Sequence, residues 1–477
     1  MSKVYKNSTK VAQLNGKTIY MDDVVKGCLD GRLNLFLQGN TGDGKTQLAR
    51  DAMSYFPGES MFILGRNDMD TRELFRQINL GKLFQRPKYN LEPLVNPDTG
   101  EIEYFYPDFN GGEVASYRKL TPTQAEVVRK GLEKLAGSTE QIRELTSRIN
   151  TKLFVTDELP NCVPAVRGQL FNLYDGFIEI DGKAYPIGNF LTATHPDGRV
   201  EFLEAGADMG QVQALRESRA DIKSDAYSVG IATGNVGQQF TESSNDIGRA
   251  LRDRMHVWMD VDYFFPVSSD TLEILAGDTN PRVRLESDGQ ADGESIMRKY
   301  QEVSAREVPL EKLLVANYLI HGLDYCSKGS KRRMKSAWPT KLENHEQGSD
   351  VGLVLPVSIR GAKSIIRLSQ VLDGITKEKG AKGSDHFESM MQAYRLVAPY
   401  SGVLNGADVQ NKYDGNNYKA VDAVISTTRQ QFKDQAENIA AGFEMVEKGK
   451  RDKKVLNLFN GRWEFMRSTL DGMLGGK

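Results

Sequence analysis

The string GNTGDGKT at residues 39–46 constrains this chain more than any other feature. It fits the pattern G-x-x-x-x-G-K-[ST], in which glycines let backbone N–H groups converge on phosphate oxygens at the start of a helix. An apolar run at 33–37 precedes it, and a helical pattern at 47–50 follows it. Strand, loop and helix in this order are the setting that the pattern requires. We therefore expect a phosphate-binding loop here.

The side chains of this loop have separate expected roles. Lys45 would neutralise the β- and γ-phosphates of a nucleotide, and Thr46 would ligate Mg²⁺. Asp43 brings a negative charge beside phosphates, so we expect its side chain to point outward. ATP and Mg²⁺ are the expected nucleotide and metal ion, although the loop does not distinguish ATP from GTP. The predicted binding residues are Gly39, Asn40, Thr41, Gly42, Asp43, Gly44, Lys45 and Thr46.

A second acidic element lies at residues 153–158, where the apolar run LFVT ends in Asp157 and Glu158. Asp157 would hold Mg²⁺ through its water shell, and Glu158 would polarise the attacking water as a general base. Strands often end in acidic residues at a protein surface, so this pattern alone is weak evidence. The phosphate-binding loop upstream supports the functional interpretation. Together the two elements predict a site for nucleotide hydrolysis.

The chain has 477 residues, which predicts two or three domains. Short apolar runs alternate with helical patterns up to about residue 265, and this predicts crossover connections and a parallel sheet. The predicted strands lie at 33–37, 61–64, 153–155, 228–232 and 257–261. Residues 120–153 carry a helical pattern, and the chain after about residue 303 is helical.

The fold class that we expect is an α/β core with a parallel sheet, followed by helices. The expected divisions are a lead-in at 1–30, the core at 31–300 with insertions near 80–150 and 189–226, a helical region at 301–400 and a helical C-terminal extension at 401–477.

The near-zero net charge excludes a strong electrostatic field around the whole protein. The 62 Lys and Arg residues nearly cancel the 64 Asp and Glu residues, so binding to nucleic acid or to an anionic membrane needs a local patch. The three cysteines cannot form a complete disulfide framework, which fits a reducing setting, and neither they nor the five histidines show metal-ligand spacing. No run of 18 apolar residues and no apolar leader segment occurs. We therefore expect a cytoplasmic protein without a membrane partner.

Further strings complete a resemblance to a known family. They are LFNLYDG at 170–176, a hairpin at 177–187, IATGN at 231–235, RALRDRM at 249–255 and SIR at 358–360. In this order, after the loop and the acidic pair, they resemble the MoxR branch of AAA+ ATPases, including the CbbQ- and NorQ-type members. The resemblance covers most of residues 30–375 and fails over the two insertions and the last hundred residues. It implies a P-loop AAA+ core followed by an α-helical lid.

The resemblance also implies three more catalytic residues. Asn235 is similar to the sensor-1 residue that helps to place the water, Arg254 to the arginine finger, and Arg360 to the arginine that starts the sensor-2 helix. Arg249 and Arg252 remain alternatives for the finger. Because Arg254 follows a predicted helix at 245–251 and precedes a strand, we expect it at the carboxyl-side edge of the sheet, facing a neighbouring subunit.

A second sensor-like string, LTATHP at 191–196, directly follows the hairpin, where MoxR proteins usually place sensor 1. It lacks the asparagine. The string IATGN has this asparagine, Asn235, which lies 19 residues before Arg254, close to the spacing in the family. We favour Asn235 and interpret residues 192–195, which include His195, as part of an inserted strand.

The expected function is ATP hydrolysis that drives chaperone-like remodelling of a protein partner, with a homo-hexameric ring implied by the resemblance. Many members of the family act beside a von Willebrand factor A domain, which would here belong to a separate chain. The alternative is a nucleic-acid motor or restriction subunit of McrB-like character. Basic clusters at 328–335 and 448–454 support it, whereas the near-neutral charge argues against it. A slowly hydrolysing structural switch is a third possibility.

Overall fold

The computed structural model divides by its contacts into two units, one of Met1–Met69 with Asn150–Lys477 and one of Asp70–Ile149. For the described residues between 76 and 118 and between 143 and 147, only the backbone is described. The described residues are 5–66, 76–78, 92–95, 102–110, 113–125, 143–145, 147–180, 183–204, 214–215, 217–235, 247, 249–277, 279–284, 293–323, 354, 357–460 and 463–475.

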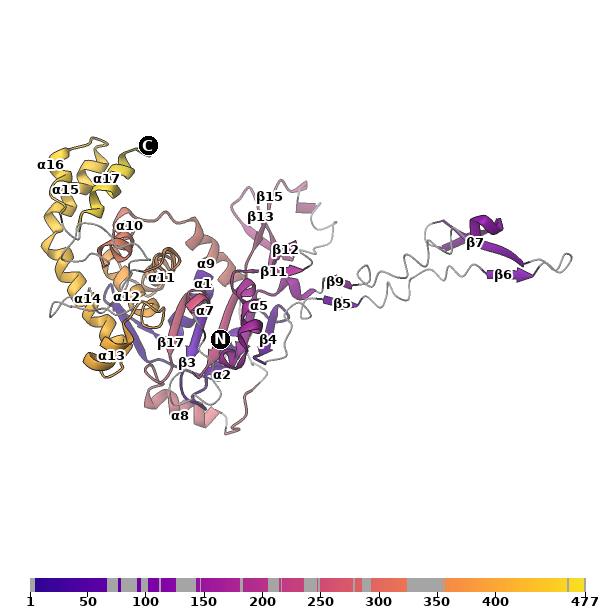
Figure 1. Ribbon diagram of the computed structural model, residues 1–477, viewed down its shortest axis with the longest axis horizontal. Helices are drawn as coiled ribbons and strands as arrows, with labels where there is room; N and C mark the ends of the chain where they lie inside the picture. The colour runs from indigo at the N-terminus through magenta and orange to yellow at the C-terminus, as the bar shows by residue number, and fades with distance from the viewer. Residues whose placement is uncertain are drawn as a thin grey trace. The chain divides into compact units, whose positions relative to one another are not determined.

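A five-stranded parallel sheet forms the centre of the larger unit (Figure 1). Its strands in spatial order are β17 (Val257–Asp260), β3 (Leu35–Gln38), β16 (Val229–Gly234), β10 (Leu153–Asp157) and β4 (Ser60–Leu64). Every neighbouring pair is parallel. The three central strands are buried along their whole length, which explains their nearly continuous apolar sequences. The prediction of a parallel sheet from these five runs is confirmed.

The order of the strands decides which segments can meet. The strand before the phosphate loop, β3, lies between β17 and β16, and β16 separates it from β10. Because all five strands run in one direction, the segments that follow them meet at the carboxyl edge of the sheet. The segments that precede them lie at the opposite edge.

Helices and a short hairpin surround this sheet. The hairpin joins β1 (Lys10–Leu14) to β2 (Lys17–Tyr20), and the helices are α1 (Met21–Gly31), α2 (Lys45–Met53), α5 (Pro164–Tyr174), α7 (Arg249–Arg252), α8 (Ser268–Gly277) and α9 (Gly293–Ala305). Short 3-10 turns lie at Ser147–Asn150 and Leu159–Asn161. The expected hairpin at 177–187 is confirmed, as β11 (Phe177–Ile180) pairs antiparallel with β12 (Lys183–Pro186).

The segment that we expected as a second insertion forms a small sheet of its own. It contains β13 (Asn189–Thr194), β14 (Val200–Glu204) and β15 (Asp221–Ala226), in the antiparallel order β14-β13-β15. Residues 192–194 of the second sensor-like string therefore belong to an inserted strand, outside the parallel sheet.

The smaller unit contains two antiparallel arrangements. One pairs β5 (Arg76–Ile78) with β9 (Arg143–Leu145), and the other orders β6 (Glu92–Val95), β7 (Ile102–Asn110) and β8 (Glu113–Leu120). The helical prediction for 120–153 is wrong at Arg143–Leu145, because these residues pair with β5, a partner distant in sequence. Residues 122–125 are helical, and the rest of that stretch up to 142 lies outside the described residues.

The C-terminal region is largely helical, as the sequence predicts (Figure 1). It runs through α10 (Leu310–Asn317), a π-helix η5 (Tyr318–Gly322), α11 (Ile359–Glu378), α12 (His386–Val397), α13 (Gly406–Tyr413), α14 (Asn417–Asp434), α15 (Ala436–Glu447), α16 (Lys453–Leu456) and α17 (Phe465–Gly475). The charged interruption expected at 447–454 ends α15.

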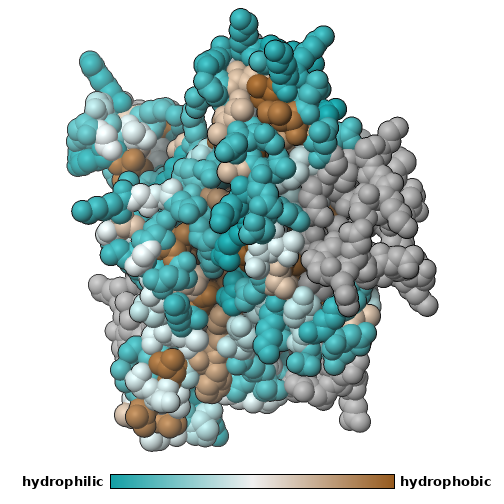
Figure 2. Space-filling view, turned by 90° about the vertical axis from the view of Figure 1, so that its left-hand side faces the viewer, coloured by the Kyte–Doolittle hydropathy of each residue, from teal (hydrophilic) through white to brown (hydrophobic). Residues whose placement is uncertain are grey.

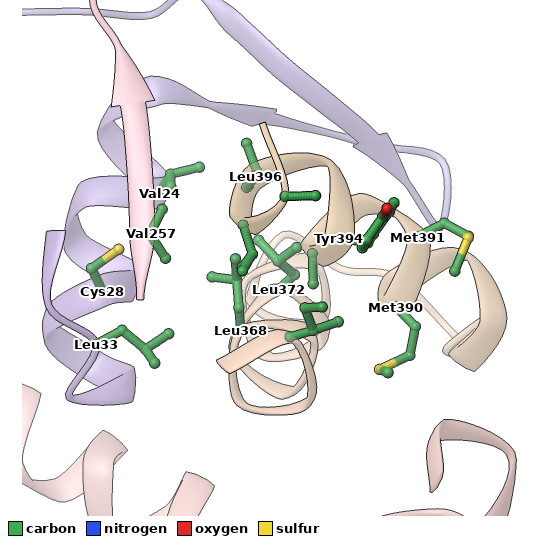
Figure 3. Packing of buried hydrophobic residues seen from close by; sticks show 14 of the residues in the cluster. Val24, Cys28, Leu33, Val257, Leu368, Leu372, Met390, Met391, Tyr394 and Leu396 are labelled. Carbon is green, nitrogen blue, oxygen red and sulfur yellow. The ribbon is translucent and has the colours of Figure 1, made fainter. Parts of the chain in front are cut away.

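One hydrophobic core joins the sheet to these helices. Figure 3 shows Cys28 of α1, Val257 of β17, Leu368 and Leu372 of α11 and Leu396 of α12 gathered in the same interior. All five side chains are buried. The C-terminal helices therefore pack directly against β17, the strand next to β3.

The surface toward the viewer in Figure 2 is largely hydrophilic, and its hydrophobic residues lie in small separate groups. Among the helices that the structure describes, none combines the length and the hydropathy needed to cross a membrane.

Candidate nucleotide-binding site

The carboxyl edge of the sheet gathers the residues that the sequence predicted for phosphate and metal binding. The phosphate loop follows β3, Asp157 ends β10, and Asn235 follows β16. The loop leads into α2, which begins at Lys45. Gly44, the residue before it, has φ +79°, and a Cβ atom there would meet the ring of Tyr5 at 2.2 Å. This position therefore requires glycine for its backbone angle and for the close approach of that ring.

Lys45 is buried, and its side chain is hydrogen-bonded to carbonyl groups of its own loop. Its Nζ donates to the carbonyl of Gly39 at 3.0 Å and to that of Asn40 at 2.5 Å. Burial lowers the pKa of Lys45, and neighbouring carboxylates, first among them Glu158, oppose this shift. The ammonium group thus lies inside the loop with loop carbonyls as its partners, in the position from which a phosphate could exchange for them.

Thr46 and Asp157, the two residues predicted to hold a metal ion, are hydrogen-bonded to each other. Thr46 Oγ1 donates to Asp157 Oδ1 at 2.8 Å, and Thr233 Oγ1 donates to the same oxygen at 2.5 Å. Three elements, α2, β10 and β16, therefore converge on one carboxylate oxygen. Asp157 is itself buried, so two hydroxyl donors fix the direction in which its carboxylate points.

Glu158 follows with an uncommon backbone conformation, φ +55° and ψ +43°. A non-glycine residue in this region is rare and turns the chain sharply at the end of the strand. Its N–H donates to Thr233 Oγ1 at 3.2 Å. Burial, and then the charge of Asp157, raise the pKa of Glu158, while Lys45 lowers it. A carboxylate of raised pKa is a stronger base than an ordinary glutamate, as a general base requires.

The donor set fits a magnesium ion. Mg²⁺ keeps several waters and takes one or two protein oxygens together with phosphate oxygens. One hydroxyl and one carboxylate at hydrogen-bonding distance supply those protein oxygens. Within the described residues no group of three or more His, Cys, Asp and Glu side chains could hold a metal ion by itself. Thr46 and Asp157 are thus the residues that would hold Mg²⁺ beside a nucleotide.

Asn235 lies at the phosphate loop, whereas His195 does not. Asn235 Nδ2 donates to Thr41 Oγ1 at 3.2 Å, and its buried Oδ1 accepts no hydrogen bond from the described residues. An acceptor oriented this way can hold a water molecule. His195 follows β13, and its Nε2 lies 3.3 Å from Glu201 of the inserted sheet. The geometry therefore places Asn235, and not His195, beside the predicted phosphate loop.

Alanine substitutions at these two positions should separate the two sensor-like strings. Asn235→Ala is expected to lower kcat for ATP hydrolysis by about 10-fold to 100-fold, because it removes the group that orients water. His195→Ala should leave kcat within about twofold of the parent, since its partner belongs to the inserted sheet. Steady-state hydrolysis rates at saturating ATP measure both. A large loss confined to His195→Ala would reverse the assignment.

From its charge we expected Asp43 to point outward, and this expectation is wrong. Its carboxyl group meets that of Asp262, and the pKa of Asp43 is raised to about 6 by burial, by this hydrogen bond and by the charge of Asp262. Asp262 also accepts from Asn40, at 2.9 Å and 3.1 Å from the backbone N–H and at 2.7 Å from Nδ2. The physical reason for the difference is that the sequence argument considered only the phosphates, whereas the fold brings Asp262 within hydrogen-bonding reach of Asp43 and disfavours its charged form.

Arg254 lies at the amino edge of the sheet, so the expectation of a carboxyl-side position is wrong. Its carbonyl accepts from Asn34, the residue just before β3, at 3.0 Å. Its guanidinium bonds Asp175 at 2.9 Å and lies over the ring of Phe171, with 4.6 Å to the centroid. A residue that precedes a parallel strand must lie where that strand begins, and the phosphate loop follows the other end of β3.

Arg360 lies at the same amino edge. Its guanidinium is 3.6 Å from Asp175 and 3.7 Å from Asp253, and Ser358, which caps α11, donates to Asp253 at 2.8 Å. The two predicted catalytic arginines therefore share the carboxylate of Asp175, away from the phosphate loop of their own chain. Of the alternatives for the finger, Arg252 lies over the ring of Trp258, with 5.4 Å to the centroid. The side chain of Arg249 lies outside the described residues.

Three residues of the site were missed from the sequence. Thr233 directly follows the strand predicted at 228–232, so its place at the carboxyl edge could have been inferred. Asp262 follows β17 in the same way and carried the same signal. Asp175 lies in the string LFNLYDG, but only the tertiary structure shows that it pairs with the two arginines.

These features define an α/β protein whose parallel sheet carries a phosphate-loop sequence and an acidic pair at its carboxyl edge. No protein-family model matches the chain, and no curated protein matches it. Solved structures do resemble it. One is a crystal structure of a "putative ATPase" from Cytophaga hutchinsonii, with 11% identity and a TM-score of 0.47, covering 85% of this chain and 88% of that one. We infer the function from the site residues.

Proposed function

We propose that this chain is a P-loop ATPase of the AAA+ kind, and that it works in a ring of its own copies to remodel a protein partner. The observation that carries the proposal is the convergence of Thr46, Thr233 and Asp157 beside Lys45 and Glu158 at one edge of the sheet. Phosphoryl transfer needs positioned charge more than covalent chemistry, and this set provides it.

Each residue has a stated task in the proposed reaction. Lys45 leaves the carbonyls of Gly39 and Asn40 and pairs with phosphate oxygens of the nucleotide. Thr46 and Asp157 would hold Mg²⁺, which would neutralise charge on the transferred phosphoryl group. Asn235 orients the attacking water, and Glu158 accepts its proton.

The arginines complete the site from a neighbouring copy. Gly39 lies five positions after Asn34, a span of roughly 16 Å in an extended strand. Arg254, bonded to Asn34, cannot extend across that distance to its own loop. A ring in which the amino edge of one copy faces the carboxyl edge of the next would bring Arg254 and Arg360 to the γ-phosphate. Hydrolysis would then depend on assembly.

We propose separately that the partner is a protein. Its remodelling beside a separate von Willebrand factor A domain chain is what the MoxR resemblance implies. The basic cluster at 328–335, which supports the nucleic-acid alternative, lies outside the described residues. The cluster at 448–454 lies around the start of α16, where Arg451 pairs with Asp471 at 2.7 Å. That pairing favours a structural role there over a phosphate contact.

Lys45→Ala tests the proposal directly. It should weaken ATP binding by about 100-fold, because the loop loses the cation that meets the phosphates and each tenfold corresponds to about 1.4 kcal/mol. Calorimetry with excess Mg²⁺ measures the affinity. Thermal unfolding without nucleotide checks that the variant is folded.

Lys412→Ala is the matched control, since Lys412 is an exposed lysine of α13 that pairs with Asp408. It should bind ATP like the parent. Equal ATP affinity in Lys45→Ala and in the parent would contradict the proposed site.

A further inference from the structure

Asp260, the last residue of β17, is the centre of a hydrogen-bonded network beneath the phosphate loop. Its Oδ2 accepts from Gln38 Nε2 and from Tyr400 Oη, both at 2.6 Å. Its Oδ1 accepts from the N–H groups of Asp262 at 3.0 Å and Tyr263 at 3.2 Å. Both carboxylate oxygens thus fix other groups, and hydrogen bonds to a charged acceptor are among the stronger ones.

One side of this network leads to the phosphate loop. Gln38 directly precedes Gly39, and its carbonyl accepts from the N–H of Val261 at 2.8 Å. Asp262, placed by its bond to Asp260, holds the backbone N–H and the side chain of Asn40. The first residues of the loop are therefore fixed against the segment after β17.

The other side leads to the C-terminal helices. The ring of Tyr400 stacks on Trp258 with 5.6 Å between centroids, and the ring of Tyr418 stacks on Tyr263 at 4.3 Å. The hydroxyl of Tyr418 accepts from the N–H of Asp260 at 3.2 Å. Burial raises the pKa of both tyrosines, so their hydroxyls stay protonated, and that of Tyr400 donates to the carboxylate.

We propose that Asp260 is a positioning residue through which Tyr400 and Tyr418 of the C-terminal region set the nucleotide affinity of the phosphate loop. The inference rests on the proposed ATPase function and assigns a task to a region outside the family resemblance. A loop held in its binding conformation binds more tightly than one that adopts it only part of the time. By linkage, bound nucleotide must in turn stabilise the contacts of Tyr400 and Tyr418.

Tyrosine-to-phenylalanine variants test the proposal, because they remove a hydroxyl and keep the stacked ring. Tyr400→Phe and Tyr418→Phe should each weaken ATP binding by about fivefold, and the double variant by more than tenfold. The hydrolysis rate at saturating ATP should change less than KM, since neither side chain is placed beside the phosphates. Calorimetry and steady-state kinetics measure the two effects.

Tyr227→Phe is the matched control. Its hydroxyl is also buried and donates to the carbonyl of Leu29 at 2.7 Å, outside the network of Asp260. It should lose a similar amount of thermal stability and bind ATP like the parent. An equal loss of ATP affinity in Tyr227→Phe would mean that any buried hydroxyl has this effect, and would overturn the inference.

Hydrogen exchange on the parent gives a readout that needs no variant. ATP should slow exchange of the amides of Asp262, Tyr263 and the first turn of α14, and leave Leu191 of β13 unchanged. ATP binding with no added protection at these amides overturns the inference and leaves the proposed function standing. The same holds if Lys45→Ala loses binding while the double phenylalanine variant keeps it. If the parent binds no ATP, the inference falls together with the proposed function.

Discussion

Arg254→Ala is expected to bind ATP like the parent and to hydrolyse it about 10³ to 10⁵ times more slowly, the range that arginine fingers supply elsewhere. Arg254 lies at the amino edge of the sheet, bonded through its carbonyl to Asn34 and through its guanidinium to Asp175. Under the proposed function it would serve the nucleotide of another copy. Arg360→Ala should behave in the same way, since Arg360 shares Asp175 with Arg254.

Mixing two inactive variants tests action on a neighbour. An Arg254→Ala subunit keeps Glu158, and a Glu158→Gln subunit keeps Arg254. In a mixed ring the second subunit supplies its arginine to the first, so hydrolysis should rise above the sum of the separate variants. Size-exclusion chromatography of a mixture with one tagged variant shows whether mixed assemblies form.

The control for this experiment is Arg298→Ala, an exposed arginine of α9 that pairs with Glu294 at 3.2 Å. It should hydrolyse ATP at the parental rate, alone or mixed. Mixed assemblies of Arg254→Ala and Glu158→Gln with no gain in activity would show that Arg254 does not act on a neighbour. Full activity of Arg254→Ala alone would show that it is not the finger.

Glu158→Gln should keep ATP affinity within about threefold and lower kcat by about 10² to 10⁴, because the amide retains the shape of the side chain and loses the base. The raised pKa of Glu158 adds a pH dependence. A base works deprotonated, so activity falls as pH decreases through its pKa. The acid limb of the parental rate should therefore lie above pH 4.5, the ordinary value for glutamate.

Glu311→Gln provides the matched comparison, because burial also raises the pKa of Glu311, on α10. It should keep the parental kcat and the parental acid limb. Single-turnover measurements with saturating protein separate the chemical step from release of products. A Glu158→Gln variant that hydrolyses ATP at the parental rate would mean that another group is the base.

The sequence alone could predict those parts of the site that depend on local order along the chain. A loop rich in glycine between a strand and a helix must present its N–H groups together, and this fixed the positions of Lys45 and Thr46 at the start of α2. The acidic pair at the end of β10 followed from the same reasoning, since the carboxyl ends of parallel strands share one edge. Five apolar runs were enough to predict the sheet.

The tertiary structure decided what depends on partners distant in sequence. It separated Asn235 from the similar string at 191–196, because strand order puts β16 beside β3 and leaves β13 in another sheet. It moved Arg254 to the amino edge and joined it to Arg360 through Asp175. It also turned Asp43 toward Asp262, against the expectation from charge. Local patterns specify the conformation of a segment. The burial of apolar surface across the whole chain decides which segments become neighbours, and no single stretch of sequence encodes this.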